Sequence, residues 1–450
     1  MNLDFIDILV IVILLSITFF SGFIASKKAK NNEESYILAG RKLTTPLFVA
    51  TLVATWYGSI LGVGEFVYNY GTLAWLCLAF PYYISALIFA LFFSGKIRAI
   101  NVLSIPHQIE ITYGKKASIL ASLIILIVTL PSAYVLMLGV VVSDLTGLGL
   151  IASIIIGTVF SFSYIYKGGF NSDIYANLSQ FVIMYLGFAI FLYFLIDSFG
   201  SPLTLLDSVP EKYVFTLNYE NLPYIISWFF IALQTFIDPS FFQRCSAARD
   251  VKTARNGILY SILFWIVFDL LTLITGLYAI NNIQTTEPIN TYLLLGDLVL
   301  PPIFKGIFYS AIIATIMSTL NSYGFLSAVT IGNDILKKLE FNFKNPTKIG
   351  IIISAILSII IASYIPSVID IFYKTASITI PSIFLPLLLS FSNKIKIKDN
   401  KIILYMLIVF VISLISLILQ TNQNSIYQPM QIGLIASLIL LFAFKEKRIN

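Results

Sequence analysis

The sequence predicts an all-α integral membrane protein with about thirteen transmembrane helices. Of its 450 residues, 58% are hydrophobic and only 11% are charged. Apolar runs of roughly twenty residues recur along the chain, which is the length a helix needs to cross about 30 Å of hydrocarbon. The runs are centred near residues 15, 56, 84, 130, 157, 185, 232, 267, 318, 356, 380, 411 and 436.

The basic residues predict how these helices are oriented. All but Lys212, Lys305 and Lys374 of the 28 lysines and arginines lie in alternate gaps between the runs. By the positive-inside rule we expect the N-terminus outside, the C-terminus in the cytoplasm and a multi-pass protein of the plasma (inner) membrane. The net charge of +6 therefore reflects orientation rather than a nucleic-acid partner. The gaps expected in the cytoplasm include Lys27, Lys28, Lys30, Arg244, Arg249, Lys252, Arg255, Lys445, Lys447 and Arg448.

The gaps between the runs are too short for a soluble domain, so residues 1–450 are expected to form one transmembrane domain. The first run, residues 6–25, follows Asp4 and Asp7 and precedes a basic stretch, which is the reverse of a signal peptide's charge order. We therefore expect it to be retained. Cys77 lies in a run and Cys245 in a gap, so no disulfide framework is expected.

Two of the runs are expected to be broken helices. The second contains "ATWYGSILGVGEF", with three closely spaced glycines, and the seventh contains "ALQTFIDPSFFQR", in which Asp238-Pro239 interrupts the helix. Irregular backbone at membrane depth is tolerated only against protein or a water-filled cavity. Breaks five runs apart predict two inverted repeats, residues 44–198 and 221–391, with an extra helix at 6–25 and extra helices at 402–445. The alternative is that the glycines and the proline only permit close packing.

The ninth run contains a row of hydroxyl groups. In "IATIMSTLNSYG", Thr315, Ser318, Thr319 and Ser322 have the i, i+3, i+4, i+7 spacing of a single helix face. Oxygen ligands without a carboxylate are suited to a monovalent cation that must be released again. The alternative is that these hydroxyls bond to carbonyls of their own helix or bridge to a neighbouring one.

Four stretches, taken in order, resemble the sodium:solute symporter family over nearly the whole chain. They are "SIPHQIEITYG", "KGGFNSDIYANLSQ", "QRCSAARDVKTARNG" and "AIIATIMSTLNSYGFLSAVTIGNDI". The resemblance implies the LeuT-like fold and sodium-driven import of a small polar organic solute by alternating access. It also implies Na+ as the coupling ion, and we expect no organic cofactor, with the solute, sodium and the lipid bilayer as partners and no nucleic acid.

The resemblance also implies the ion site. By motif position, the hydroxyls of Ser318 and Thr319 and the carbonyl of Thr315 are expected to bind sodium, joined by backbone carbonyls near Leu52 and Thr55. Where the family usually has Thr-Asp before a glutamine, this chain has Ala176-Asn177. In members that bind a second sodium, that aspartate contributes to the site. We therefore expect one sodium ion per transport cycle.

The solute site rests on the breaks and on charges inside the runs. The expected cavity residues are Trp56, Tyr57, Gly58, Gln234, Tyr373 and Lys374. Lys374 either binds a solute carboxylate, replaces the missing second cation, or pairs with Asp370 four residues earlier. Asp269 either pairs with Lys374, bonds across helices or carries a proton, and Glu65 is assigned to the outer gate or to structure.

Rival functions have weaker support in the sequence. An integral membrane enzyme is disfavoured because His107, the only histidine, falls in a gap between runs and no nucleophile-base pair or metal-ligand cluster is visible. A transporter-like sensor is disfavoured because the chain ends soon after its last run, at "FKEKRIN". A proton-coupled transporter of the same fold remains the main alternative.

Overall fold

The computed structural model describes residues 3–27, 33–100, 102–214, 222–365, 367–392, 394–420 and 428–447. Three residues of the basic gaps, Lys28, Lys30 and Arg448, lie outside these ranges. So does residue 221, at which the second repeat is expected to begin.

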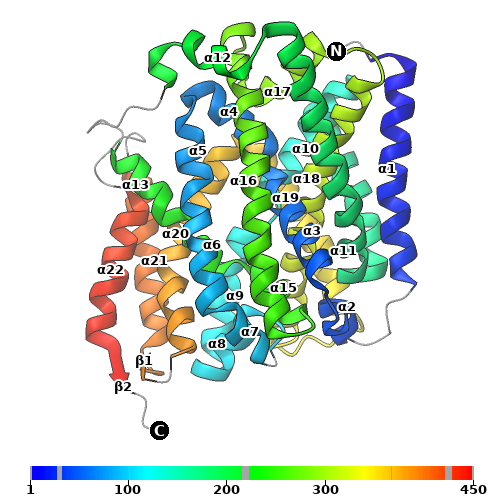
Figure 1. The fold of residues 1–450 in the computed structure, drawn as a ribbon. Coiled ribbons are helices and arrows are strands. Elements are labelled where there is room, and N and C mark those ends of the chain that lie inside the picture. Colours follow the sequence, from blue (N-terminus) through cyan, green and yellow to red (C-terminus); the bar gives the residue numbers. More distant parts are fainter. Residues whose placement is uncertain are drawn as a thin grey trace.

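Long apolar helices run side by side through the molecule (Figure 1). Within the described ranges, eleven helical segments are long and apolar enough to cross a membrane, which makes the protein a multi-pass membrane protein. They are α1 (Phe5–Ser26), α3 to α4 (Thr45–Tyr70), α5 to α6 (Leu73–Phe92), α9 to α10 (Lys115–Thr146), the second part of α11 (Ile165–Phe199), α13 to α15 (Leu222–Ala247), α16 (Val251–Asn282), α18 to η5 (Phe304–Leu336), α19 (Pro346–Tyr364), α20 (Val368–Ser390) and α21 (Ile402–Leu419).

Two shorter apolar helices occupy the remaining two expected positions. One is the first part of α11, Leu150–Ser163, and the other is α22, Pro429–Phe444. Helix α11 as a whole spans Leu150–Phe199 and is kinked at Gly169, where φ is 58°. The total of thirteen crossings and the division into two repeats stay predictions.

Short elements close the two ends of the bundle. In Figure 1, α12 (Pro202–Ser208) and α17 (Thr291–Val299) lie at the upper end. At the lower end lie α2 (Glu33–Leu38), α7 (Ser94–Ala99), α8 (Ile105–Tyr113) and an antiparallel pair of strands, β1 (Ile395–Ile397) and β2 (Lys445–Lys447). Helix α1 begins at the upper end, whereas α22 leads to β2 at the lower end. Which end faces the cytoplasm stays a prediction.

Both expected breaks are confirmed. Helix α3 (Thr45–Trp56) passes through a 3-10 turn, Tyr57–Ser59, into α4 (Ile60–Tyr70). The second break separates α13 (Leu222–Ile231), α14 (Gln234–Ile237) and α15 (Pro239–Ala247). Asp238 has extended backbone angles, and its Oδ1 accepts the Ser240 N–H at 2.7 Å. The side chain thus caps α15, which the proline prevents from continuing the preceding helix.

Helix α18 (Phe304–Val329) is the centre of the bundle and continues as the π-helix η5 (Thr330–Leu336). It is buried without interruption over residues 308–332, with α11, α1, α3 and α19 packed around it. The Asp7 carboxylate of α1 caps its start, because Oδ1 accepts the N–H groups of Ile303 at 2.8 Å and Gly306 at 3.0 Å. Helix α1 therefore stabilises the start of the helix that carries the hydroxyl row.

Candidate ion and solute sites

The hydroxyl row of α18 meets the end of α3 just before its break. The Oγ of Ser318 lies 2.5 Å from the carbonyl oxygen of Ala54 and 2.9 Å from that of Thr315. The hydroxyl of Thr319 donates to the carbonyl of Thr55 at 2.6 Å. All five residues are buried. We call these two hydroxyls and three carbonyls the uncharged cluster.

Close helix packing brings these oxygens together. A Cβ added to Gly58 would lie only 2.2 Å from the Cβ of Thr319, so no larger residue fits there. We expected Gly58 to line the solute cavity, but it packs against Thr319 of α18 and is not among the described lining residues of the cavity. A sodium ion bound in the uncharged cluster would be coordinated by the oxygens that now form these hydroxyl-to-carbonyl hydrogen bonds.

Thr315 and Leu52, two of the expected ligands, are placed differently from Ser318 and Thr319. The Thr315 hydroxyl donates to the Ala311 carbonyl of its own helix at 2.6 Å, so only its carbonyl is available to the uncharged cluster. The carbonyl that Ser318 contacts on α3 belongs to Ala54 rather than to Leu52. Leu52 lies two residues before Ala54 and is also buried. The sodium-binding roles of Leu52, Thr55, Thr315, Ser318 and Thr319 stay predictions.

A second polar cluster surrounds Arg244. The positive-inside pattern assigned this residue to a cytoplasmic gap, but it lies in α15 with its side chain 0% exposed. It is the only lysine or arginine among the described residues that is fully buried. We call the group the Arg244 cluster, which consists of Thr51, Thr55, Asp173, Asn177, Ser240, Arg244 and Ser322.

Oxygen atoms from four helices surround the guanidinium. Its Nη2 donates to the hydroxyls of Thr51 at 2.9 Å, Thr55 at 2.6 Å and Ser322 at 3.2 Å. Its Nη1 donates to the Ser240 hydroxyl at 2.9 Å. The Asp173 Oδ2 lies 3.7 Å from Nη2, close enough for an ion pair but not for a hydrogen bond. A buried charge needs such compensation.

Asp173 and Asn177 reach this cluster from consecutive turns of α11. The Asp173 Oδ2 accepts the Ser322 hydroxyl at 2.7 Å, and the Asn177 amide donates to Thr51 at 2.9 Å. We noted from the sequence that Asn177 replaces the family's usual aspartate, but we did not predict the carboxylate at residue 173. The i, i+4 spacing within "NSDIYAN" places both side chains on one helix face and could have revealed it.

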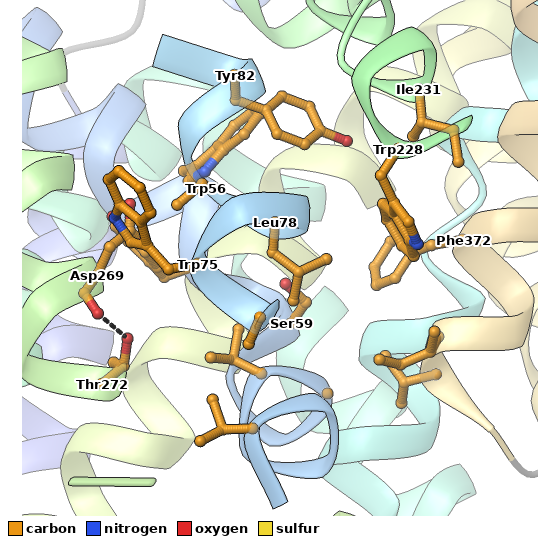
Figure 2. A pocket seen from close by; sticks show the side chains of 18 of the residues that line it. Trp56, Ser59, Trp75, Leu78, Tyr82, Trp228, Ile231, Asp269, Thr272 and Phe372 are labelled. Atoms are coloured by element: carbon orange, nitrogen blue, oxygen red, sulfur yellow. Dashed lines mark hydrogen bonds between the residues drawn. The ribbon is translucent and has the colours of Figure 1, made fainter. Parts of the chain in front are cut away.

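A cavity of about 110 Å³ lies beside the break in α3 and α4. Figure 2 shows Trp56, Trp75 and Asp269 on one side and Trp228 and Phe372 on the other. Asp269, from α16, is the only charged residue among the described residues that line the cavity. Its carboxylate accepts a hydrogen bond from the hydroxyl of Tyr83. The aromatic lining consists of Trp56, Tyr57, Trp75, Tyr82, Tyr134, Trp228, Tyr323 and Phe372.

The structure brings some of the expected cavity residues together and not others. Trp56, Tyr57 and Gln234 line the cavity. Tyr373 does not, since its hydroxyl donates to Gln428 of the neighbouring α22 region. Lys374 is also absent from the lining and lies 3.0 Å from Asp370, with its side chain 45% exposed.

The remaining cavity residues had no sequence signal of their own. The rings of Tyr82, Tyr134, Trp228 and Phe372 come from segments far apart in the chain, and aromatic residues make up 15% of the whole sequence.

Glu65 of α4 is not among the described lining residues of the cavity. Its Oε1 accepts the Ser367 hydroxyl at 3.3 Å, which links α4 to the start of α20.

His107 lies outside both polar clusters and the cavity, in the short helix α8. Its Nδ1 accepts the Leu103 N–H at 3.4 Å, so the ring is held as a neutral tautomer. Partial burial, together with the positive charge of Lys338, lowers the pKa of His107. This arrangement indicates a structural role for the histidine.

The family profile of sodium:solute symporters, described as "Sodium:solute symporter family", matches residues 36–348. The chain belongs to this family. Its members are transporters rather than enzymes. Both polar clusters and most of the cavity lie within the matched residues.

Two curated family relatives are similar over part of the chain. High-affinity choline transporter 1 of Caenorhabditis elegans is 27% identical over 41% of this chain and 34% of its own length. High-affinity proline transporter PutP of Bacillus subtilis (strain 168) is 24% identical over 54% of both proteins. The chain thus matches between about a third and a half of the length of these relatives.

A solved structure shows the fold over the full length. The substrate-bound outward-open state of a Na+-coupled sialic acid symporter superposes with a TM-score of 0.77, covering 100% of both chains at 14% identity. The protein therefore has the LeuT-like transporter fold.

Proposed function

We propose that the protein is a sodium-coupled symporter that imports a small organic solute bearing a positively charged nitrogen. The observation that carries the solute class is the cavity beside the α3–α4 break. Its walls are aromatic, and Asp269 is the only charged residue among the described residues that line it.

Each part of this cavity favours a cation. A positive nitrogen over an aromatic face gains about 0.5–2 kcal/mol, and more where water is excluded. A carboxylate at membrane depth is costly without a positive partner, which the solute itself would supply to Asp269. Because no lysine or arginine is among the described lining residues, a solute carboxylate would have no basic side chain to pair with. This departs from the expected role of Lys374.

The relatives agree with this solute class. A choline transporter and a proline transporter are among the similar proteins, and both solutes carry a positively charged nitrogen. Choline lacks the carboxylate that proline has. The lining therefore favours a choline-like organic cation over an amino acid.

Sodium coupling is supported by the uncharged cluster and by the family. Thr55 connects the two sites, because its carbonyl belongs to that cluster and the residue also lines the cavity. An ion that orders this backbone also orders one wall of the solute site, which is the basis for coupling by alternating access. We further propose that transport runs inward across the plasma membrane, with the N-terminus outside.

A thermal-shift experiment on purified protein tests both parts. Choline and proline are each titrated in sodium and again in potassium, because a ligand that binds the folded state raises the melting temperature by mass action. We expect choline to stabilise the protein in sodium and Asp269→Asn to abolish the shift. Lys374→Met is the matched control and should leave it unchanged.

Three other outcomes would each change the proposal. Stabilisation by proline alone would replace the organic cation with a zwitterion. Equal shifts in sodium and potassium would remove sodium as the coupling ion. Uptake driven by a pH gradient in sodium-free buffer would favour proton coupling, with Asp269 as the proton carrier.

A further inference from the structure

We propose that the Arg244 cluster is a second cation site whose permanent occupant is the guanidinium of Arg244. The inference rests on the proposed sodium symport, and it explains why a single sodium ion would move in each cycle. The chain itself supplies the other cation, tethered to α15.

The first support is the chemistry of the ligands. Three hydroxyls, those of Thr51, Thr55 and Ser322, converge on one guanidinium nitrogen within 3.2 Å. The Asp173 carboxylate stands beside them. Hydroxyl and carboxylate oxygens are the ligands that a hard metal cation takes, so this shell would suit sodium if the arginine were absent.

The second support is unused acceptor capacity in the same cluster. Asp173 is 1% exposed and Asn177 is 0% exposed. Within the described part of the chain, neither Oδ1 atom of these two residues has a hydrogen-bond partner. Buried oxygens without partners are uncommon, and the loose 3.7 Å contact with Arg244 leaves the carboxylate only partly satisfied.

The third support is the charge balance. Arg244 and Asp173 together are neutral, and the uncharged cluster next to them has no ionisable group. Removing the arginine leaves the buried Asp173 carboxylate among oxygen ligands without its cation, while the other buried carboxylate near Arg244, that of Asp238, keeps its hydrogen bonds from the Tyr323 hydroxyl and the Ser240 N–H. Adding a second carboxylate beside Asp173 while Arg244 stays in place also leaves one negative charge that Arg244 does not balance. Either change should recruit a cation from solution to restore neutrality.

The test is the sodium dependence of solute uptake in proteoliposomes, with the ratio of sodium to solute counted by isotope flux. Wild-type protein should give a Hill coefficient of about 1. Arg244→Gln should raise it to about 2, because a second ion enters the vacated shell. The double variant Asp173→Asn with Arg244→Gln should return to about 1, since it removes both charges.

Two further variants keep the test decisive if Arg244→Gln does not fold. Asn177→Asp is nearly isosteric and adds a carboxylate while Arg244 stays in place, so it should also give a coefficient of about 2. Arg244→Lys preserves the charge and should stay at about 1. Steeper sodium dependence of the melting temperature in Arg244→Gln and Asn177→Asp provides the same readout without transport.

The possible failures are distinguishable. If wild-type uptake does not depend on sodium, the proposed function fails and this inference fails with it. If wild-type uptake depends on sodium but Arg244→Gln and Asn177→Asp both keep a coefficient of about 1, only the resident-cation inference is overturned.

Discussion

The uncharged cluster and the Arg244 cluster share two helices, α3 and α18, and they meet at Thr55, whereas α11 and α15 contribute only to the Arg244 cluster. The Thr55 carbonyl faces the first, and its hydroxyl belongs to the second. The first has no charge of its own, whereas the second contains an arginine and an aspartate that are both buried. Two neighbouring oxygen shells of similar hydroxyl composition thus differ in that one contains a cationic side chain and the other does not.

The largest effect should come from breaking the charge pair. Asp173→Asn removes the ion-pair partner of the buried Arg244 guanidinium, and breaking a buried pair typically costs about 3–5 kcal/mol. We expect a large drop in the melting temperature of the purified protein. The control is Glu340→Gln, which removes the exposed ion pair with Lys115 and should leave the melting temperature unchanged. Equal stability of Asp173→Asn and wild type would show that the pair is dispensable.

The next effect separates the two faces of Thr55. Thr55→Val removes the hydroxyl that binds Arg244 but keeps the carbonyl that Thr319 contacts. A lost hydrogen bond to a charged group costs about 1.5–3 kcal/mol, so stability should fall. The sodium concentration for half-maximal uptake should change less than about twofold. A large loss of sodium affinity would mean that the two clusters act as one.

A smaller effect on free energy should identify the sodium ligands. Thr319→Val removes one oxygen from the uncharged cluster, and we expect sodium affinity to fall about tenfold, or about 1.4 kcal/mol. Thr315→Val makes the same change four residues earlier, but its hydroxyl only bonds back to Ala311. In sodium titrations of uptake, Thr315→Val should therefore have a sodium affinity close to that of the wild type. Equal losses in both variants would indicate general damage to α18.

The smallest effect is expected outside both clusters, at His107. Because its pKa is lowered in the folded protein, the unfolded chain binds more protons as the pH falls below about 6.5, and stability falls with it. Protonation also abolishes the Nδ1 acceptor for the Leu103 N–H. His107→Gln should slightly reduce the drop in melting temperature between pH 7.5 and pH 5.5. An unchanged slope would show that the ring is not held neutral.

The sequence was sufficient for the multi-pass helical architecture and its two breaks because these features are properties of single segments, whereas the LeuT-like fold was expected from the family resemblance. Apolar runs of spanning length, the glycines at the first break and Asp238-Pro239 at the second each have a local physical meaning. The hydroxyl row on α18 was also visible, since helix periodicity places Ser318 and Thr319 on one face. These features are recognisable without knowledge of what packs against them.

The rest depends on which helices are neighbours. Arg244 belongs to the alternating basic pattern that predicts cytoplasmic gaps, so the sequence does not distinguish it from loop arginines. In the structure, however, α15 places its side chain inside the protein, beside Asp173. Lys374 looked like a buried charge from its place in an apolar run, but its side chain is 45% exposed and paired with Asp370. The aromatic cavity is assembled from rings of several helices, and no spacing along the chain predicts their meeting.

The uninterrupted burial of α18 has a consequence for how the protein is made. A helix with a row of hydroxyls and no lipid-facing side over residues 308–332 gains little from the bilayer when it stands alone. Helices α1, α3 and α11 precede it in the chain, and they supply the Asp7 cap, the carbonyl partners and the Asp173 acceptor. Synthesis from the N-terminus thus inserts these helices first, so that α18 enters a membrane that already contains the hydrogen-bond partners of its polar groups.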